Sequence, residues 1–467
     1  MTSTSNLLFR SLITAAGISV LAPSDAQSQK QAPPAPGTPR NFTLPATRSF
    51  TLANGLQVTL IPYGTVPKTW MQLVVRSGNA NEGANQVWLA DLTGDLMEQG
   101  TTTRSASQVA AQAAGMGGSV NVSVGPDETT ISGSALSEFA PRMVGLIADV
   151  TRNPLFPEAD VARLKTDQIR SLAQSKVQPS SIAMERFRSV MYPDHAYGRI
   201  FPTEAMINSF TLANVRDFYA ANFGAGRAHL YIAGKFDAQA SEAAIRSAFA
   251  GWARGAAPAE NIPKPVSRKS IYLVDRPGAV QSTLMLGLPV LNPSNPDYPA
   301  LSVTNALLGG SFGSRITRNI RENKGYTYSP SSSVSNRYRD AYWAQSADVT
   351  TDVTGASLKE IFFEVDRLRT EPPSVDELRG IQNYLAGIFV LQNSSPTGII
   401  SQLRFLNLHG LKRDYLENFV RRVHAVTPAE VMRIAQTYIR PDQMTIVVVG
   451  DKAKVASQLL PYGLTME

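Results

Sequence analysis

The chain of 467 residues contains no cysteine and only four histidines. The lack of cysteine excludes a disulfide framework, thiolate metal sites and a cysteine nucleophile. The histidines stand alone, because none is followed by a glutamate at the third position or by a histidine at the fourth. They are His195, His229, His409 and His424. The sequence therefore lacks the paired imidazoles and neighbouring carboxylate that serve a catalytic zinc ion on one helix.

The features of a nucleotide-binding or nucleic-acid-binding protein are also missing. There is no Gly-x-x-x-x-Gly-Lys-Ser/Thr loop to hold phosphates. The formal charge is +7, but the basic residues are dispersed and form no run interleaved with aromatic residues, so nucleic acid is not an expected partner. The composition, 43% hydrophobic and 17% charged, is that of a globular protein. The length predicts roughly two to four domains.

The N-terminus carries a short apolar run, Leu12–Ala22, preceded by Arg10 and followed by small residues at positions 24 and 26. This pattern predicts a cleavable signal peptide over residues 1–26, and hence a periplasmic or secreted protein. The run is shorter than the roughly 20 residues of a membrane span, and no later segment is expected to cross a bilayer. Residues 27–46 read as a Pro-rich linker. The alternative interpretation of the apolar run is an N-terminal core helix. The Pro-rich linker argues against it, because it would isolate such a helix from the rest of the protein.

The second half of the chain repeats the first. Thr211–Asp237 aligns without gaps on Thr427–Ala453, at an offset of 216 residues. In both copies a threonine precedes a helical pattern, which leads to a β-branched strand closed by glycine. We therefore predict an α+β protein of two homologous domains, residues 47–253 and 270–467, joined by an Ala-, Pro- and Gly-rich linker over residues 254–269.

Local patterns place three further elements. Asn54-Gly55 lies between alternating apolar residues and predicts a β-hairpin. The segment Trp88–Gln99 has the periodicity of a helix, and Ser119–Val124 alternates as a strand does.

The most distinctive stretch covers residues 309–329, GGSFGSRITRNIRENKGYTYS. It predicts a glycine turn, a helix, a second turn at Gly325 and a strand with Tyr326 and Tyr328 on it. The helix carries Arg315, Arg318 and Arg321. The order of Gly-Gly, Ser-Arg, Arg-Glu and Gly-x-x-Tyr resembles the arginine–tyrosine segment of the pitrilysin/insulysin family, which includes the mitochondrial processing peptidases. The resemblance covers residues 50–464 and implies two α/β half-domains in tandem that form half of a clamshell.

The same resemblance locates where a zinc site should be. Members of the family carry His-x-x-Glu-His on the first long helix, shortly before a Gly-Thr pair. Counted back from Gly100-Thr101, the histidine positions fall on Asp91 and Asp95 and the glutamate position falls on Gly94. In the family the third zinc ligand is a glutamate on a later helix, which corresponds here to Glu158–Gln174. No glutamate occupies a convincing position on it. Asp91 and Asp95 share one helical face, so the alternatives are a site for a harder cation such as Ca²⁺ or Mg²⁺ or two solvated charges.

The resemblance also assigns roles to the second-half motif. Arg321 and Tyr328, seven residues apart, would bind the substrate main chain and stabilise charge on the carbonyl oxygen, as a guanidinium and a protonated phenol can. Tyr326 would share a strand face with Tyr328 and is the competing tyrosine. The structural alternative pairs Arg321 with Glu322 on the helix surface. Arg315 is expected to fix the start of the helix.

These observations predict a non-catalytic subunit of a heterodimeric zinc metallopeptidase. The chain would bind no metal and would be inactive alone. Its partner would be a homologous subunit that carries zinc on His-x-x-Glu-His, and the substrates would be peptides. The alternative is a catalytically inert peptide-binding or scaffold protein of the same fold.

Overall fold

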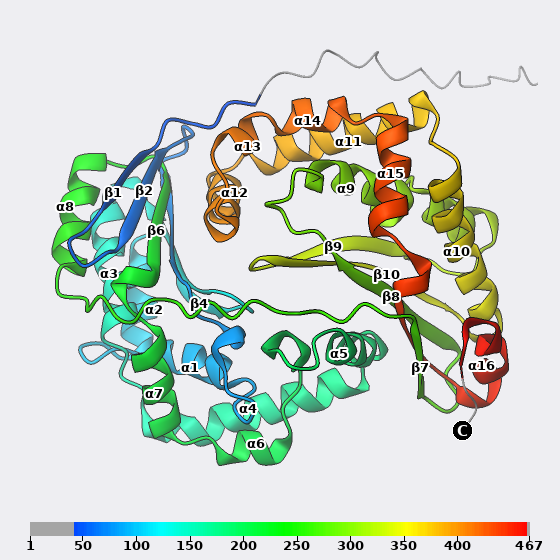
Figure 1. Ribbon diagram of the computed structural model, residues 1–467. Helices are drawn as coiled ribbons and strands as arrows, with labels where there is room; N and C mark the ends of the chain where they lie inside the picture. The colour runs from blue at the N-terminus through cyan, green and yellow to red at the C-terminus, as the bar shows by residue number, and fades with distance from the viewer. Residues whose placement is uncertain (1–41, 465–467) are drawn as a thin grey trace, which may run out of the picture. The chain divides into compact units, whose positions relative to one another are not determined.

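Two mixed β-sheets with matching strand orders form the framework of the protein (Figure 1). The computed structural model describes residues 42–464, so the predicted signal peptide and most of the Pro-rich linker lie outside the described residues. The first sheet runs β1 (Arg48–Thr51), β2 (Gln57–Pro62), β6 (Ala228–Gly234), β3 (Lys68–Val75), β5 (Thr129–Leu136) and β4 (Val120–Val124). The second runs β7 (Ser270–Asp275), β11 (Thr445–Gly450), β8 (Gln281–Val290), β10 (Asp340–Thr350) and β9 (Ser331–Arg337).

Strand pairing confirms the duplication. In the first sheet β2 and β6 are parallel, and β6, β3, β5 and β4 pair antiparallel in that order. In the second sheet β7 and β11 are parallel, and β11, β8, β10 and β9 follow antiparallel in the same order. The additional strand β1 pairs with β2 through the predicted hairpin, whose Gly55 has a φ of 95°. Glycine alone adopts this conformation at little cost.

Helices follow the same order in each half. The first half contains α1 (Leu89–Met97), α2 (Ala106–Gly115), α3 (Ala140–Arg152), α4 (Glu158–Val177), α5 (Pro179–Met191), α6 (Glu204–Ser209), α7 (Leu212–Asn222) and α8 (Ala238–Phe249). The second half contains α9 (Tyr298–Asn305), two π-helical segments η5 (Ala306–Gly310) and η6 (Thr317–Asn323), α10 (Thr354–Thr370), α11 (Val375–Gln392), α12 (Pro396–His409), α13 (Asp414–Glu417), α14 (Phe419–Ala425), α15 (Pro428–Tyr438) and α16 (Lys452–Leu459). No helix or strand forms within residues 254–269.

The repeated threonines cap equivalent helices. The Thr211 hydroxyl accepts from the backbone N–H of Asn214 at the start of α7, and the Thr427 hydroxyl accepts from Glu430 at the start of α15. In each case the side chain of the third residue reaches back to the threonine N–H, which completes a capping box.

Each half lends one helix to the other half's sheet. Helix α5 packs on β8 and β11 of the second sheet, whereas α12 packs on β6 and β3 of the first. The α5 contact is apolar, with Phe187 and Met191 in one buried cluster with Met285 and Val447. On the α12 side, the Arg404 guanidinium donates to the Gln72 and Glu128 side chains of the first half at 2.9 Å. None of the helices within residues 42–464 combines the length and the apolar character needed to cross a bilayer.

The capping boxes predict a measurable stability. Replacing Thr427 with alanine removes the hydroxyl that satisfies a first-turn N–H of α15, and should lower the free energy of unfolding by about 1 kcal/mol. Thr437→Ala is the matched control, because the Thr437 hydroxyl only bonds back to the Arg433 carbonyl within the same helix, and alanine is the better helix former. Urea denaturation measures both. Equal losses in the two variants would contradict the assignment.

Candidate functional site

The helix that should carry a zinc motif is α1, and it packs directly against edge strand β4. Gly94 faces the strand: a Cβ atom there would lie 2.7 Å from Val124 Cγ2 and 3.5 Å from Val122 Cγ1. The approach to Val124 is shorter than real Cβ contacts, whereas that to Val122 is an ordinary contact. A side chain at this position would therefore compete for space with Val124. Asp91 is partly buried, so it does not fit the expectation of a solvated charge.

A hydrogen-bonded carboxyl cluster precedes α1. Asn79 donates to Asp91 Oδ2 at 2.7 Å and to Glu82 Oε1 at 3.2 Å, and the Ala90 N–H also donates to Glu82 Oε1. Glu82 is 7% exposed. Burial, with repulsion from Asp91 as a further cause, raises the pKa of Glu82 to about 8 and burial also raises the pKa of Asp91. Glu82 is therefore mostly protonated at neutral pH, when it is a poor metal ligand.

The later helix completes no metal site. Gln168 of α4 is buried and donates to the Trp88 carbonyl at 3.1 Å, so it ties α4 to the start of α1. The pKa of Asp95 is raised to about 6, chiefly by burial and then by repulsion from Asp91 and Glu98. Repulsion from Asp167 of α4 adds to this shift. Across residues 42–464, no three His, Cys, Asp or Glu side chains are grouped so that they could hold a metal ion.

The free edge of the first sheet is partly occupied. Alternation along β4 turns the N–H groups of Val120, Val122 and Val124 away from β5. The Val122 N–H donates to Glu98 Oε1 at 2.6 Å. A carboxylate on the last turn of α1 thus takes an edge donor that an added strand would need. Neither Glu82 nor Glu98 was predicted from the sequence to have a role.

In the second half the structure brings Arg321 and Tyr328 together. The Arg321 guanidinium carbon lies 4.9 Å from the centre of the Tyr328 ring and 4.5 Å from the centre of the Phe312 ring. Both rings are mostly exposed, at 80% and 71%, so the guanidinium is held between two solvent-facing aromatic groups. Arg321 Nε also lies 3.2 Å from Glu322 Oε1, as the structural alternative expects. A single contact at Nε leaves the two terminal nitrogens of the fork, which are the donors for a carbonyl oxygen.

Tyr326 and Tyr328 do not share a strand, and that expectation is wrong. Gly325 has a φ of 64°, and the Tyr326 N–H donates to the Ile320 carbonyl at 2.8 Å, which closes the end of η6. The Tyr326 ring then packs against the core while Tyr328 projects into solvent. Only Thr327 pairs with the sheet, through an isolated bridge to Val349. This separation favours Tyr328 over Tyr326 as the functional tyrosine.

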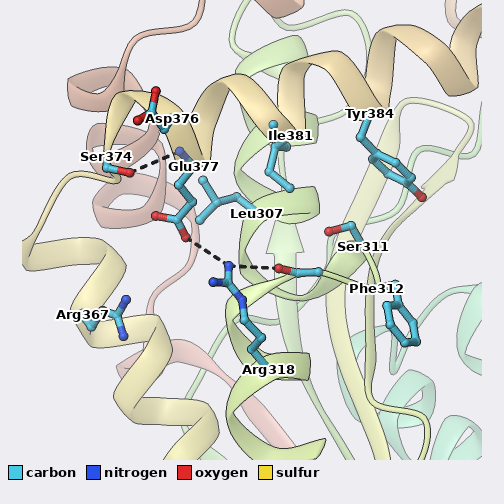
Figure 2. Close-up of a pocket in the computed structure, with 12 residues that line it drawn as sticks. Leu307, Ser311, Phe312, Arg318, Arg367, Ser374, Asp376, Glu377, Ile381 and Tyr384 are labelled. Atoms are coloured by element: carbon cyan, nitrogen blue, oxygen red, sulfur yellow. Dashed lines mark hydrogen bonds and ion pairs between the residues drawn. The ribbon is translucent and has the colours of Figure 1, made fainter. Parts of the chain in front are cut away.

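Arg315 has the structural role expected of it. It is 6% exposed, and its guanidinium makes a bidentate contact with Glu377 of α11 at 2.9 and 2.8 Å. The Arg315 guanidinium lowers the pKa of the Glu377 carboxyl. Arg318 lies 3.9 Å from the same carboxylate at one end of a pocket of about 650 Å³ (Figure 2). Phe312 lines the mouth of this pocket. Phe312 was not predicted from the sequence, although an aromatic residue between Gly310 and Gly313 was a visible signal.

Family comparisons match both halves. A model described as insulinase, peptidase family M16, matches residues 60–201. A second, described as the peptidase M16 inactive domain, matches residues 209–385. Together they cover more than half of the chain.

Individual proteins give the same picture. The chain is 26% identical over 404 residues to an uncharacterized zinc protease of Mycobacterium bovis, over 84% of this chain and 90% of that protein. It is 25% identical over 331 residues to an uncharacterized zinc protease of Rickettsia felis, over 70% of this chain and 79% of that protein. A Pseudomonas fluorescens structure described as a peptidase M16 inactive domain superposes with a TM-score of 0.80 at 24% identity, over 87% of this chain and 98% of that one. The structure of a Helicobacter pylori protease superposes with a TM-score of 0.82 at 18% identity, over 87% of this chain and 100% of that one.

The raised pKa of Glu82 predicts a pH-dependent stability. The folded protein holds this proton more tightly than the unfolded chain, so the free energy of unfolding should fall as pH rises from the ordinary value of 4.5 to about 8, by at most about 1.4 kcal/mol per pH unit. Glu82→Gln should flatten this decline, and Glu138→Gln, at an exposed position, should not. Urea titrations at several pH values measure the slope. An unchanged slope in Glu82→Gln would contradict the prediction.

The close approach of Val124 to Gly94 predicts that the missing glutamate cannot simply be restored. Gly94→Glu should destabilise the fold by about 2 kcal/mol or more, because it overpacks the contact with Val124 and buries a carboxyl. Val124→Ala should recover part of that loss in the double variant. Gly115→Glu on α2, where a Cβ atom meets nothing within 4 Å, is the control for the substitution itself. Thermal unfolding followed by circular dichroism measures all four, and a lack of coupling would show that the two residues do not compete for space.

Proposed function

Because the chain belongs to the insulinase-like peptidase family M16, we propose that it is the non-catalytic subunit of a heterodimeric zinc metallopeptidase. It contributes Arg321 and Tyr328 to peptide hydrolysis at a zinc ion that a homologous partner holds. The chain binds no metal of its own and is inactive alone. Members of the family often act as pairs of homologous chains, which makes such a partner available in principle.

The observation that carries the proposal is the placement of Arg321 between two exposed rings. A long arginine side chain on a surface normally samples many rotamers, and fixing it costs conformational entropy. Stacking against Phe312 and Tyr328 offsets that cost, at about 0.5–1 kcal/mol for each exposed cation–π contact. The guanidinium, whose side chain is 23% exposed, and the exposed phenol of Tyr328 would then act as pre-positioned donors. Donors of this kind stabilise an oxyanion without reorganisation during the reaction.

The first half supports the same proposal from the opposite side. Asp91, Gly94 and Asp95 stand where a zinc peptidase of this family needs His, Glu and His. Val124 would compete for space with a side chain at the position of the missing glutamate, and Glu98 holds an edge N–H of β4. A hydrolytic zinc site needs about three ligands and a base, so we propose that another chain holds the metal. The relatives are described as zinc proteases. For this chain we propose the role of the subunit that supplies Arg321 and Tyr328.

The cellular location is a related proposal. The N-terminal pattern of a signal peptide over residues 1–26 favours export, and the absence of cysteine is compatible with an oxidising compartment. We therefore place the proposed heterodimer in the periplasm, acting on peptides or unfolded segments. Detection of the mature N-terminus near residue 27 in a periplasmic fraction would support this location.

Reconstitution tests the proposal. The chain should be mixed with a homologue from the same genome that carries His-x-x-Glu-His, and cleavage of unstructured peptides measured. Neither chain alone should cleave well, and the mixture should. Arg321→Ala and Tyr328→Phe should each lower kcat of the mixture on the order of 10²–10³-fold without reducing assembly.

Two controls separate this role from a general loss of structure. Arg379→Ala removes an exposed arginine from α11 and should leave activity unchanged. Tyr326→Phe removes the competing phenol and should also be neutral. Full activity in Arg321→Ala and Tyr328→Phe would favour the inert scaffold alternative. Stoichiometric, tightly bound zinc in the isolated chain would overturn the non-catalytic assignment.

A further inference from the structure

The pocket beside Arg321 lies between η5 and α11, which contact each other as α1 and α4 do in the first half. In the first half, Gly94 meets the valines of β4. The corresponding approach in the second half is Gly309, where a Cβ atom would lie 2.6 Å from Ser332 Oγ of β9. The two halves thus place a glycine against an edge strand in the same way, and the second half has an open pocket beside this glycine, with a volume of about 650 Å³.

The walls of this pocket are mainly apolar. Ile381 and Tyr384 project into it from α11, opposite Ser311 and Phe312 (Figure 2). Leu307 also lines the pocket, on the side of Glu377 (Figure 2). At the far end, positive and negative side chains balance one another. These are Arg318, Arg367, Asp376 and Glu377. A pocket with this lining suits an apolar group, has ample room for a large one, and offers no net charge for a charged one.

One buried polar atom in the pocket wall lacks a partner. Ser311 is 8% exposed, and its hydroxyl makes no hydrogen bond within the described residues. A buried hydroxyl normally finds a partner, since leaving it unpaired costs free energy. Gly309, Ser311 and Gly313 match the spacing of a serine-hydrolase elbow, but Ser311 follows a helical turn rather than a strand and has an extended φ of −124°. Ser311 is therefore a hydrogen-bonding group and not a nucleophile.

We infer that this pocket binds an aromatic side chain of the peptide substrate, with tyrosine preferred because its hydroxyl can pair with Ser311. The inference rests on the proposed function, since it takes the peptide main chain to lie against Arg321 and Tyr328. Phe312 makes the connection: its ring contacts the Arg321 guanidinium and also lines the pocket. A side chain next to the residue held at Arg321 therefore reaches the pocket mouth. The pocket lies wholly on this chain, so the preference does not depend on the partner.

Gly380 allows a direct test. It lies on α11 in the pocket wall, and a Cβ atom there would meet nothing within 4 Å. Gly380→Leu should fill the pocket without strain in the helix. Gly387→Leu is the matched control, because Gly387 lies two turns further along α11, is equally unobstructed and does not line the pocket.

The measurement is the Kd of three fluorescent peptides for the isolated chain, identical except for Tyr, Phe or Ala at one position. The wild-type chain should bind the Tyr and Phe peptides about tenfold more tightly than the Ala peptide. Gly380→Leu should abolish that preference and leave the Ala peptide unaffected, and Gly387→Leu should keep it. Ser311→Ala should remove the advantage of Tyr over Phe.

The outcomes separate this inference from the proposed function. Arg321→Ala should weaken all three peptides by a similar factor. If Arg321→Ala has no effect while Gly380→Leu still removes the aromatic preference, the pocket is supported as a binding site and the role proposed for Arg321 is contradicted. If the wild-type chain binds the three peptides within about twofold of one another, or fails to bind them, or if Gly380→Leu and Gly387→Leu behave alike, the pocket does not read the substrate.

Discussion

The exchange of helices between the two halves is the packing constraint on which the rest of the structure depends. Helix α5 covers the second sheet and α12 covers the first, so neither half buries its own sheet completely. The buried cluster around Phe187 and Val447 holds α5 against the second sheet. The hydrogen bonds of Arg404 to Gln72 and Glu128 hold α12 against the first. Because buried apolar area supplies most of the stability of a fold, the two halves are expected to fold as one unit. The Arg321 segment is therefore carried on a fixed support.

Within this duplicated frame the two halves have diverged in opposite directions. In the first, Gly94 packs against Val122 and Val124 of β4, burial raises the pKa of Glu82, and Glu98 accepts a hydrogen bond from an edge N–H of β4. In the second, the glycine turn leaves Phe312 and Tyr328 exposed around Arg321. Two π-helical segments flank this turn. Such segments are rare and often mark functional sites.

The duplication could be predicted because it depends on local periodicity. The positions of Asp91, Gly94 and Asp95 were taken from the resemblance to the family, by counting back from Gly100-Thr101 along one helix. The α7 and α15 caps were predictable for the same reason as the duplication. The different environments of Tyr326 and Tyr328 could not, because the path after Gly325 is set by a hydrogen bond back to Ile320. The closure of β4 by Glu98 and the pocket behind Phe312 depend on contacts between distant segments. The assigned domain bounds and the signal peptide remain predictions.

The central claim is that the zinc ion and the arginine–tyrosine pair of one active site belong to two chains. Anomalous diffraction at the zinc absorption edge, on crystals of this chain with its zinc-bearing homologue and a bound peptide, tests it most directly. The account predicts a single zinc peak on the partner's helix, with Arg321 and Tyr328 within hydrogen-bonding distance of the peptide main chain beside it. A zinc peak between Asp91 and Asp95, or a peptide that touches neither Arg321 nor Tyr328, would contradict it.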